Sequence, residues 1–306
     1  MHHGKYIPLY VLIVFVGMLI FIGILVHFAP LEVLFPTGSI ALQERNLMVI
    51  VIALMSLLAF PTIGFMFYIA WRYRADNPHH PSFAPEHTGS KKMVVILWGI
   101  PTIAVLVLAC IIWPAAHMLD PYKAISNGTK PVTIQVVALR WKWLFIYPEE
   151  HIATVNYIQF PQHTPVNFYL TADAPMNSFW IPGLGGQIYA MQGMQTQTHF
   201  LSEKTGEFTG KASEINGEGY ADMHFDVKVT SEEEYQNWLN TIKQNNHPFL
   251  FADYQVLSKP ELITTHAFYS SVDPNLYDTI LMKDMMPTPT PGGMDNMNMQ
   301  GMDMEK

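Results

Sequence analysis

Cysteine and charge are what this sequence has least of. Its 306 residues include one cysteine, Cys110, which lies in a long apolar run. A single thiol excludes intrachain disulfides, CxxC redox chemistry and metal sites built from several thiolates. Charged residues make up 14% of the chain, against roughly a quarter in an average soluble domain, while hydrophobic residues make up 50%. The net charge of -8 leaves no basic surface, so we expect no nucleic-acid partner.

The charge deficit is concentrated in the first 118 residues, which contain three apolar runs: 6–28, 47–71 and 93–113. Each is long enough to cross a bilayer core as a helix, which takes about 20 apolar residues. The loop between the second and third runs carries basic residues close to both helix ends: Arg72, Arg74, Lys91 and Lys92. The positive-inside rule places this loop in the cytoplasm, and everything after Trp113 outside.

Residues 1–30 leave two alternatives open. Lys5 before an apolar stretch is typical of a secretory signal, but the stretch exceeds the about 7–15 residues of a signal's apolar region. No small-x-small cleavage site stands out. We favour an uncleaved transmembrane anchor, with a cleaved signal peptide as the alternative. Residues 31–118 then form a helical hairpin with spans at about 47–71 and 93–113.

The pattern changes after Pro131 to short runs in which apolar and polar residues alternate. The expected strands are 132–138, 154–160, 166–170, 197–201, 206–211 and 221–229. Proline and glycine clusters, such as Pro182-Gly-Leu-Gly-Gly186, separate them. Many short strands with turns at this spacing predict a β-sandwich or barrel, which we assign to residues 119–230.

Residues 231–286 are predicted to form a C-terminal helical arm. Ser231 and Glu234 have the spacing of a capping box, which marks a helix start. The apolar residues that follow recur at helical spacing: Tyr235, Trp238, Leu239 and Ile242. A second helix is expected over about 274–285.

Residues 287–306 form a low-complexity tail rich in methionine, which we expect to be disordered. An alternative is that its thioethers capture Cu(I), a soft metal ion that sulfur ligands suit. The candidate ligands are Met294, Met297, Met299, Met302 and Met304.

Several longer stretches occur in a characteristic order behind the hairpin: 35–46, 141–149, 152–161, 175–182 and 187–196. Together they resemble subunit II of the haem-copper quinol oxidases, and most closely the bo-type ubiquinol oxidases. The resemblance implies a membrane protein in which transmembrane helices precede an all-β, cupredoxin-like Greek-key barrel with C-terminal helices.

Residues 209–223 resemble the loop that holds the dinuclear CuA centre in cytochrome c oxidase subunit II. That family has Cys-x-Glu-x-Cys-x3-His-x2-Met there, with one more His upstream. The resemblance places the six positions at Asn177, Ala212, Glu214, Asn216, Tyr220 and Met223. Only Glu214 and Met223 match, and a copper pair needs soft sulfur and nitrogen donors that alanine cannot supply. We therefore expect no metal, no cofactor and no catalytic residue in this subunit.

The resemblance also implies a function and a location. The complex would oxidise ubiquinol, reduce oxygen to water and pump protons, with its haems and the copper ion CuB in subunit I. This chain would pack against subunits I, III and IV in the bacterial inner membrane, with its C-terminal domain in the periplasm. Quinol reaches a site within the membrane through the lipid, so neither cytochrome c nor an extramembrane copper relay is needed.

Three alternatives remain to be tested against this hypothesis. A cytochrome c oxidase subunit carrying CuA conflicts with the absence of cysteine from the loop. A membrane-anchored, cupredoxin-like binding protein would purify without haem. A menaquinol oxidase subunit II would differ in the quinone alone.

Trp141 and Trp143 alternate in the sequence, so we expect both on one face of a strand. Packing in a core or an interface is the favoured role for both rings.

Overall fold

The computed structural model describes residues 16–17, 20–21, 23–24, 32–74, 77 and 90–283. The chain forms two compact units: residues up to 125 with 181–186 and 200–204, and the remainder from 126 onward. Most of the first apolar run and the whole tail 287–306 lie outside the described residues. The choice between anchor and cleaved signal, and the state of the tail, therefore stay predictions.

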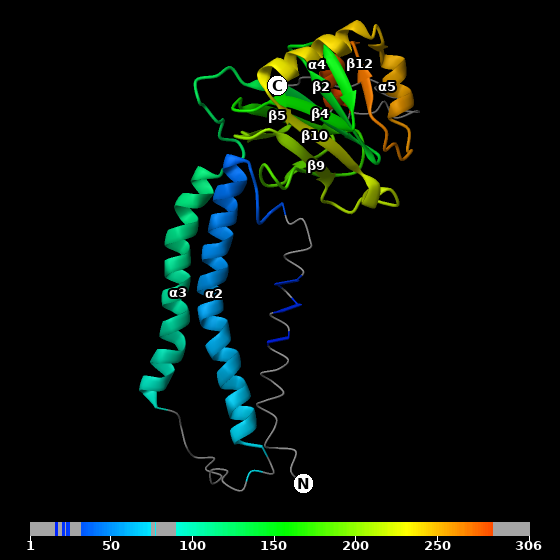
Figure 1. Ribbon diagram of the computed structural model, residues 1–306. Coiled ribbons are helices and arrows are strands. Elements are labelled where there is room, and N and C mark those ends of the chain that lie inside the picture. The colour runs from blue at the N-terminus through cyan, green and yellow to red at the C-terminus, as the bar shows by residue number, and fades with distance from the viewer. Residues whose placement is uncertain are drawn as a thin grey trace, which may run out of the picture. The chain divides into compact units, whose positions relative to one another are not determined.

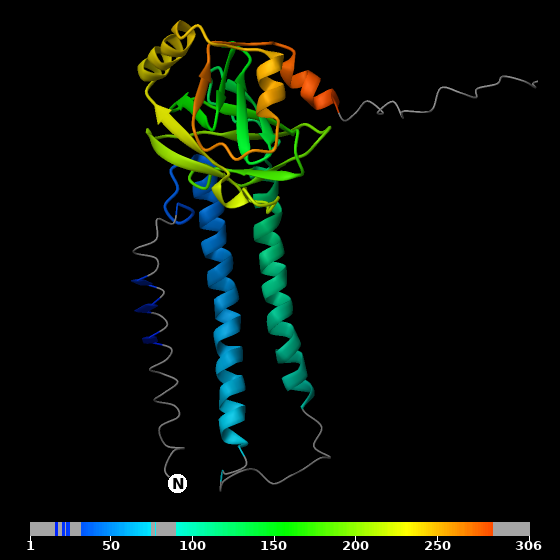
Figure 2. The ribbon, with the colours of Figure 1, turned by 90° about the vertical axis from the view of Figure 1, so that its right-hand side faces the viewer.

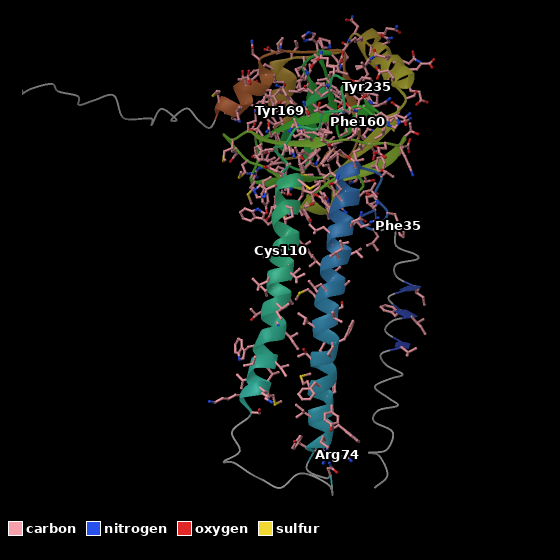
Figure 3. The ribbon with its side chains drawn as sticks, turned by 90° about the vertical axis from the view of Figure 1, so that its left-hand side faces the viewer. Phe35, Arg74, Cys110, Phe160, Tyr169 and Tyr235 are labelled. Atoms are coloured by element: carbon pink, nitrogen blue, oxygen red, sulfur yellow. The ribbon has the colours of Figure 1, made fainter. Side chains whose placement is uncertain are left out.

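The first unit contains two long helices, α2 (Ser39–Arg72) and α3 (Lys91–Met118), which lie side by side (Figures 1 and 2). Both are long and apolar enough to cross a membrane, and they contain the second and third apolar runs. Each helix extends beyond its apolar run, because polar residues near a helix end continue the helix equally well. Cys110 lies exposed on α3 (Figure 3).

The start of α2 is capped by backbone carbonyls from distant segments. Gly38, its N-cap residue, provides no side-chain bond. Instead Ser39 N–H donates to the Leu201 carbonyl at 3.2 Å and Ala41 N–H to the Leu184 carbonyl at 3.3 Å. These bonds satisfy donors that every helix start leaves open. A Cβ added at Gly38 would lie 2.4 Å from the Leu184 carbonyl oxygen, so the close approach requires glycine.

The second unit is built on two β-sheets (Figure 1). The six-stranded sheet runs β12 (Ala267–Tyr269), β3 (Ile152–Val155), β2 (Lys142–Tyr147), β1 (Val132–Leu139), β5 (Val166–Ala172) and β8 (Thr196–Phe200). The five-stranded sheet runs β4 (Tyr157–Pro161), β10 (His224–Thr230), β9 (Gly206–Ala212), β6 (Asn177–Trp180) and β7 (Ile188–Ala190). The pairs β1–β5 and β4–β10 are parallel. This confirms the predicted β-sandwich.

The single strand predicted at residues 154–160 is wrong. These residues form parts of two strands, β3 and β4, which lie in different sheets. Asn156 interrupts them with φ 55°, a left-handed conformation that Asn tolerates. Its side chain fixes the break: Oδ1 accepts Trp143 N–H at 2.8 Å, and Nδ2 donates to the Ile263 carbonyl at 2.6 Å. The chain therefore passes from one sheet to the other at Asn156.

The core between the sheets is aromatic. Trp143 of the six-stranded sheet meets Phe179 and Phe225 of the five-stranded sheet edge-on, at 5.5 and 5.6 Å between ring centroids. Phe179 and Phe225 stack at 5.2 Å. All three rings are almost fully buried. Offset and edge-to-face packing of this kind adds to the stabilisation from burial.

The C-terminal region contains α4 (Glu232–Gln244), β11 (Pro248–Phe249), α5 (Phe251–Leu257), β13 (Ser271–Val272) and α6 (Leu276–Lys283). Helices α5 and α6 cover the other face of the six-stranded sheet, whereas α4 packs against β4 and β12. Leu144 and Ile146 of β2 pack with Tyr254, Leu276 and Ile280 of the helices in a second cluster. This region also supplies β12, which pairs with β3, so the predicted helical arm is in part a strand of the barrel.

The predicted capping box starts α4 as expected. Glu234 N–H donates to Ser231 Oγ at 3.2 Å, and Ser231 N–H donates to Glu234 Oε2 at 3.3 Å. The apolar stripe of the helix buries Tyr235, Leu239 and Ile242.

Candidate functional site

The degenerate copper loop joins the end of β9 to the start of β10. Backbone bonds close it: Ala212 N–H donates to the Met223 carbonyl at 3.1 Å, and Ser213 N–H to the Ser178 carbonyl at 2.9 Å. Ala212 lies opposite Phe179 where β9 pairs with β6. A short 3-10 turn, η2 (Tyr220–Asp222), then leads into Met223. This arrangement brings Asn177, Ala212 and Met223 together.

Asn177 and Met223 bond to each other where the copper-bearing family has two ligands. Their exposed fractions are 0% and 2%, and Asn177 Nδ2 lies 3.0 Å from Met223 Sδ. The amide donates and the thioether accepts, which is a weak bond. Asn177 Oδ1 accepts Ser178 N–H at 2.8 Å. The Met223 sulfur is thus directed at an amide of its own chain.

The other loop positions offer no set of donors. Ala212 is 5% exposed and presents a methyl group. Glu214, Asn216 and Tyr220 are half-buried, and Asn216 Oδ1 has no hydrogen-bond partner among the described residues. Across residues 32–74, 77 and 90–283, no three His, Cys, Asp or Glu side chains are grouped so as to hold a metal ion. The residues present do not fit a dinuclear copper centre.

The prediction that Trp141 and Trp143 share a strand face is wrong. Leu139 pairs with Lys142, so Arg140 and Trp141 form the hairpin turn before β2. Trp141 has φ 62°, and its ring lies over the copper loop, where a Cβ on Gly219 would approach its Cγ to 2.4 Å. Trp143 is fully buried in the core, which confirms packing as its role.

Lys142, between the two tryptophans, is a residue that sequence reasoning missed. It is 1% exposed, and its Nζ donates to the carbonyls of Lys259 and Glu261, both at 2.9 Å. Burial lowers the pKa of this amine, and the charge of Glu261 partly offsets the effect. The amine ties β2 to the segment between α5 and β12. The only sequence feature that could have indicated a buried lysine is its position as a charged residue within an apolar run.

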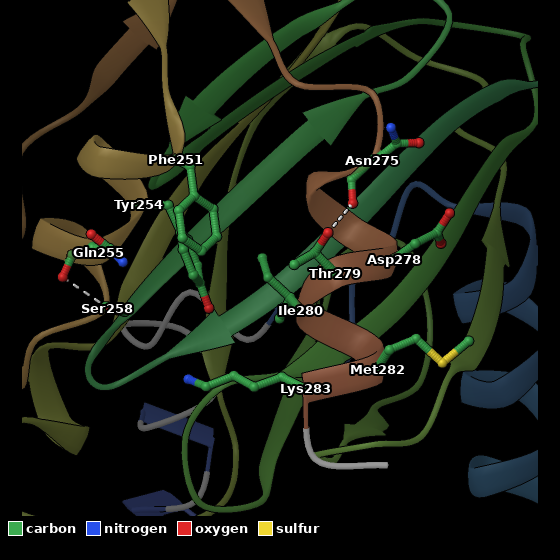
Figure 4. Close-up of a pocket in the computed structure, with 10 residues that line it drawn as sticks. All are labelled: Phe251, Tyr254, Gln255, Ser258, Asn275, Asp278, Thr279, Ile280, Met282 and Lys283. Atoms are coloured by element: carbon green, nitrogen blue, oxygen red, sulfur yellow. Dashed lines mark hydrogen bonds between the residues drawn. The ribbon is translucent and has the colours of Figure 1, made fainter. Parts of the chain in front are cut away.

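The C-terminal helices enclose a largely apolar pocket of about 590 Å³ between α5 and α6 (Figure 4). Phe251, Ile280 and Met282 form part of the apolar wall of this pocket. Beside it, Lys283 Nζ lies 2.7 and 2.9 Å from the two carboxylate oxygens of Asp173, which also accepts the Tyr254 hydroxyl. These bonds fix both helices to the end of β5.

The tail methionines proposed as Cu(I) ligands lie outside the described residues: Met294, Met297, Met299, Met302 and Met304. Copper capture by the tail stays a prediction.

Comparison with known proteins identifies two matching families. The model of the cytochrome c oxidase subunit II periplasmic domain matches residues 148–230, and that of the COX aromatic-rich motif matches residues 243–288. The periplasmic domain of cytochrome oxidase subunit II from Bradyrhizobium japonicum, a solved structure, is 24% identical. It covers 41% of this chain and 98% of its own, with a TM-score of 0.37.

Two similar proteins match over most of this chain, including its long helices. Cytochrome bo(3) ubiquinol oxidase subunit 2 of Pseudomonas putida is 40% identical over 283 residues, which is 92% of this chain and 88% of that protein. Ubiquinol oxidase subunit 2 of Acetobacter aceti is 38% identical over 255 residues, or 83% and 82% of the two chains. The predicted cupredoxin-like domain behind membrane-spanning helices is thereby confirmed, and the chain belongs to the subunit II family of haem-copper oxidases, in its bo(3)-type ubiquinol oxidase branch.

Proposed function

We propose that this chain is a non-catalytic core subunit of a proton-pumping ubiquinol oxidase. The observation that carries the proposal is the closed copper loop: Ala212 is a buried methyl and Met223 Sδ faces Asn177 Nδ2. Soft sulfur and imidazole donors are what a copper pair requires. Electrons therefore do not enter the complex through this barrel.

The chemistry of the donor explains why the barrel needs no relay. Cytochrome c is a water-soluble one-electron donor, so an oxidase that uses it must accept electrons outside the membrane. Ubiquinol carries two electrons and two protons and dissolves in lipid. It reaches a site within the span of subunit I, where we also place the haems and CuB.

The remaining task of this chain is structural. Large apolar side chains stay exposed along α2 and α3, for example Trp98 at 75% and Trp113 at 72%. Exposed apolar surface of this extent calls for lipid or a partner. We propose that α2 and α3 pack on subunit I in the bacterial inner membrane, that subunits III and IV complete the complex, and that the barrel lies in the periplasm.

The deciding experiment is purification of the chain from its native membranes. We expect it to co-purify with a haem-containing subunit, and the preparation to oxidise ubiquinol but not cytochrome c. Turnover with cytochrome c and none with quinol would contradict the proposal. Purification without haem would favour the membrane-anchored binding protein instead.

The same preparation distinguishes the two quinones. Ubiquinol and menaquinol analogues with matched side chains are compared by kcat/KM, and we expect preference for ubiquinol. Preference for the menaquinol analogue would assign the complex to the menaquinol oxidases.

A further inference from the structure

The apolar pocket between α5 and α6 belongs neither to the copper loop nor to the core between the sheets (Figure 4). Its volume of about 590 Å³ lies within the range of ligand-binding pockets, which is roughly 300–1,000 Å³. Phe251 of α5 and Met282 of α6 line it, and each is 46% exposed. Apolar surface gains free energy when it leaves water, so this pocket favours an occupant that brings apolar side chains.

The walls of the pocket are fixed by contacts within the chain. Asp173, at the end of β5, accepts bonds from both helices: from Lys283 Nζ at 2.7 and 2.9 Å, and from the Tyr254 hydroxyl. The charge of Lys283 is thereby neutralised. The other lining residues are uncharged except Asp278, which is exposed to solvent. Among the described residues that line the pocket, no unpaired charge is buried, so an uncharged apolar segment fits it best.

The chain itself continues from the edge of this pocket. Lys283, the last residue that the structure describes, is one of the lining residues, so residues 284–306 begin at the pocket. A covalent link holds such a segment near its site at an effective concentration of about millimolar. Any free apolar molecule therefore has to compete with a segment that is always present, and the C-terminal segment of the same chain is the favoured occupant.

The composition of residues 284–306 suits an apolar pocket of irregular shape. Methionine is unbranched and polarisable, so its side chain adapts to irregular apolar walls. It is also the only large apolar residue type in this segment, at Met285, Met286, Met294, Met297, Met299, Met302 and Met304.

The order of residues in the segment allows its methionines to return to the pocket. Residues 287–291 have proline at every second position and extend about 15 Å in the polyproline conformation, at roughly 3.1 Å per residue. Gly292 and Gly293 then permit a reversal of the chain. Residues 294–304 span up to about 36 Å when extended, which is more than the return distance.

We propose that the methionine-rich segment 294–304 folds back and docks in the pocket between α5 and α6, where its side chains cover the apolar wall formed by Phe251, Ile280 and Met282. Because the segment belongs to the same chain, docking needs no partner. It also withdraws thioethers from solvent, so a methionine held in the pocket is not available to Cu(I).

The test measures how fast N-ethylmaleimide alkylates a single thiol at the pocket, in detergent micelles. Cys110→Ser removes the native thiol, and Gln255→Cys places one among the lining residues. We expect the Q255C thiol to react at least about fivefold faster when the chain is truncated after Met286, since the tethered segment no longer fills the pocket. Val256→Cys is the matched control: Val256 is 64% exposed on the same helix and is not a lining residue, so its rate should not change.

A second variant keeps the length of the segment and removes its thioethers. In the Q255C chain, the methionines at 294, 297, 299, 302 and 304 are replaced by serine. We expect this chain to react as fast as the truncated one, because serine brings no apolar side chain to the pocket. Since none of the substituted side chains belongs to the buried core, all variants should keep the same unfolding temperature.

Three results would overturn the proposal. The Q255C thiol reacts equally fast with and without the segment, the V256C thiol is accelerated to the same extent, or the serine variant stays as slow as the intact chain. The same rates are then measured within the native complex. Slow reaction there that persists after truncation would mean that a neighbouring subunit covers the pocket, and would also contradict docking of the segment.

Discussion

The barrel core and the two long helices place the same kinds of side chain in opposite environments. Trp143, Phe179 and Phe225 are at most 1% exposed between the sheets, whereas Trp98 and Trp113 on α3 are more than two thirds exposed. The barrel buries its apolar surface within its own chain. The helices leave theirs for lipid or another subunit. Substitutions of equal size should therefore affect the stability of the barrel and of the helices very differently.

The largest contrast is expected from removing an aromatic ring. Phe179→Ala should lower the free energy of unfolding of the barrel by about 3–5 kcal/mol, because it leaves a cavity among four other aromatic rings. Trp113→Ala should change it by less than about 0.5 kcal/mol. Denaturant unfolding of the full chain in micelles, followed by near-UV circular dichroism, measures both. Equal losses would contradict the distinction between the two regions.

Two glycine substitutions test the same difference between barrel and helices, with a smaller expected effect on stability. Gly219→Ala should destabilise the barrel by about 1–3 kcal/mol, since its Cβ would collide with Trp141 at 2.4 Å. Gly64→Ala, inside α2, meets nothing within 4 Å and should leave the barrel unaffected. Denaturant unfolding of the two variants, measured in the same way, tests this difference. An unchanged G219A variant would show that Trp141 moves aside freely.

The two helix starts offer a third comparison, since α4 is capped by a side chain and α2 by distant carbonyls. Ser231→Ala removes the acceptor for Glu234 N–H and should cost about 1 kcal/mol of barrel stability. Ser231→Asp, which keeps an acceptor, serves as the control. Loss of stability in both variants would assign the effect to packing instead.

The smallest expected effect concerns pH and is confined to the barrel. His199 is 6% exposed and pairs through Nδ1 with Asn167 Oδ1 at 2.8 Å, and burial lowers its pKa below 6.5. Its contribution to stability is therefore fully present above pH 6.5, and is lost as pH falls through the lowered value, where the folded state must accept a proton. Unfolding free energies at pH 7.5 and 5.5 should differ less in His199→Gln. An unchanged difference would exclude this histidine as the source.

Local signals predicted α2, α3 and the start of α4 well. The capping box at Ser231 and the apolar runs that became α2 and α3 depend on neighbouring residues in the chain, so their patterns are complete in the sequence. The ligand positions of the copper loop followed from a family resemblance, and the structure adds that Asn177 and Met223 bond to each other.

Long-range contacts account for what the sequence did not reveal. Asn156 breaks a predicted strand because Trp143 and Ile263 hold its side chain from distant segments. β2 shows no alternation of apolar and polar residues, because both of its faces are covered. Phe145 points to the core between the sheets, and Leu144 points to the C-terminal helices. The burial of Lys142 depends on carbonyls more than a hundred positions away.

The carbonyl cap on α2 has a consequence for the order of events during synthesis. Ser39 and Ala41 obtain their acceptors from Leu201 and Leu184, which leave the ribosome long after the helix itself. The donors at this end of α2 must therefore be satisfied by water or headgroups until the later segments arrive. Completion of the helix start therefore reports that the segments around Leu184 and Leu201 have reached their folded positions.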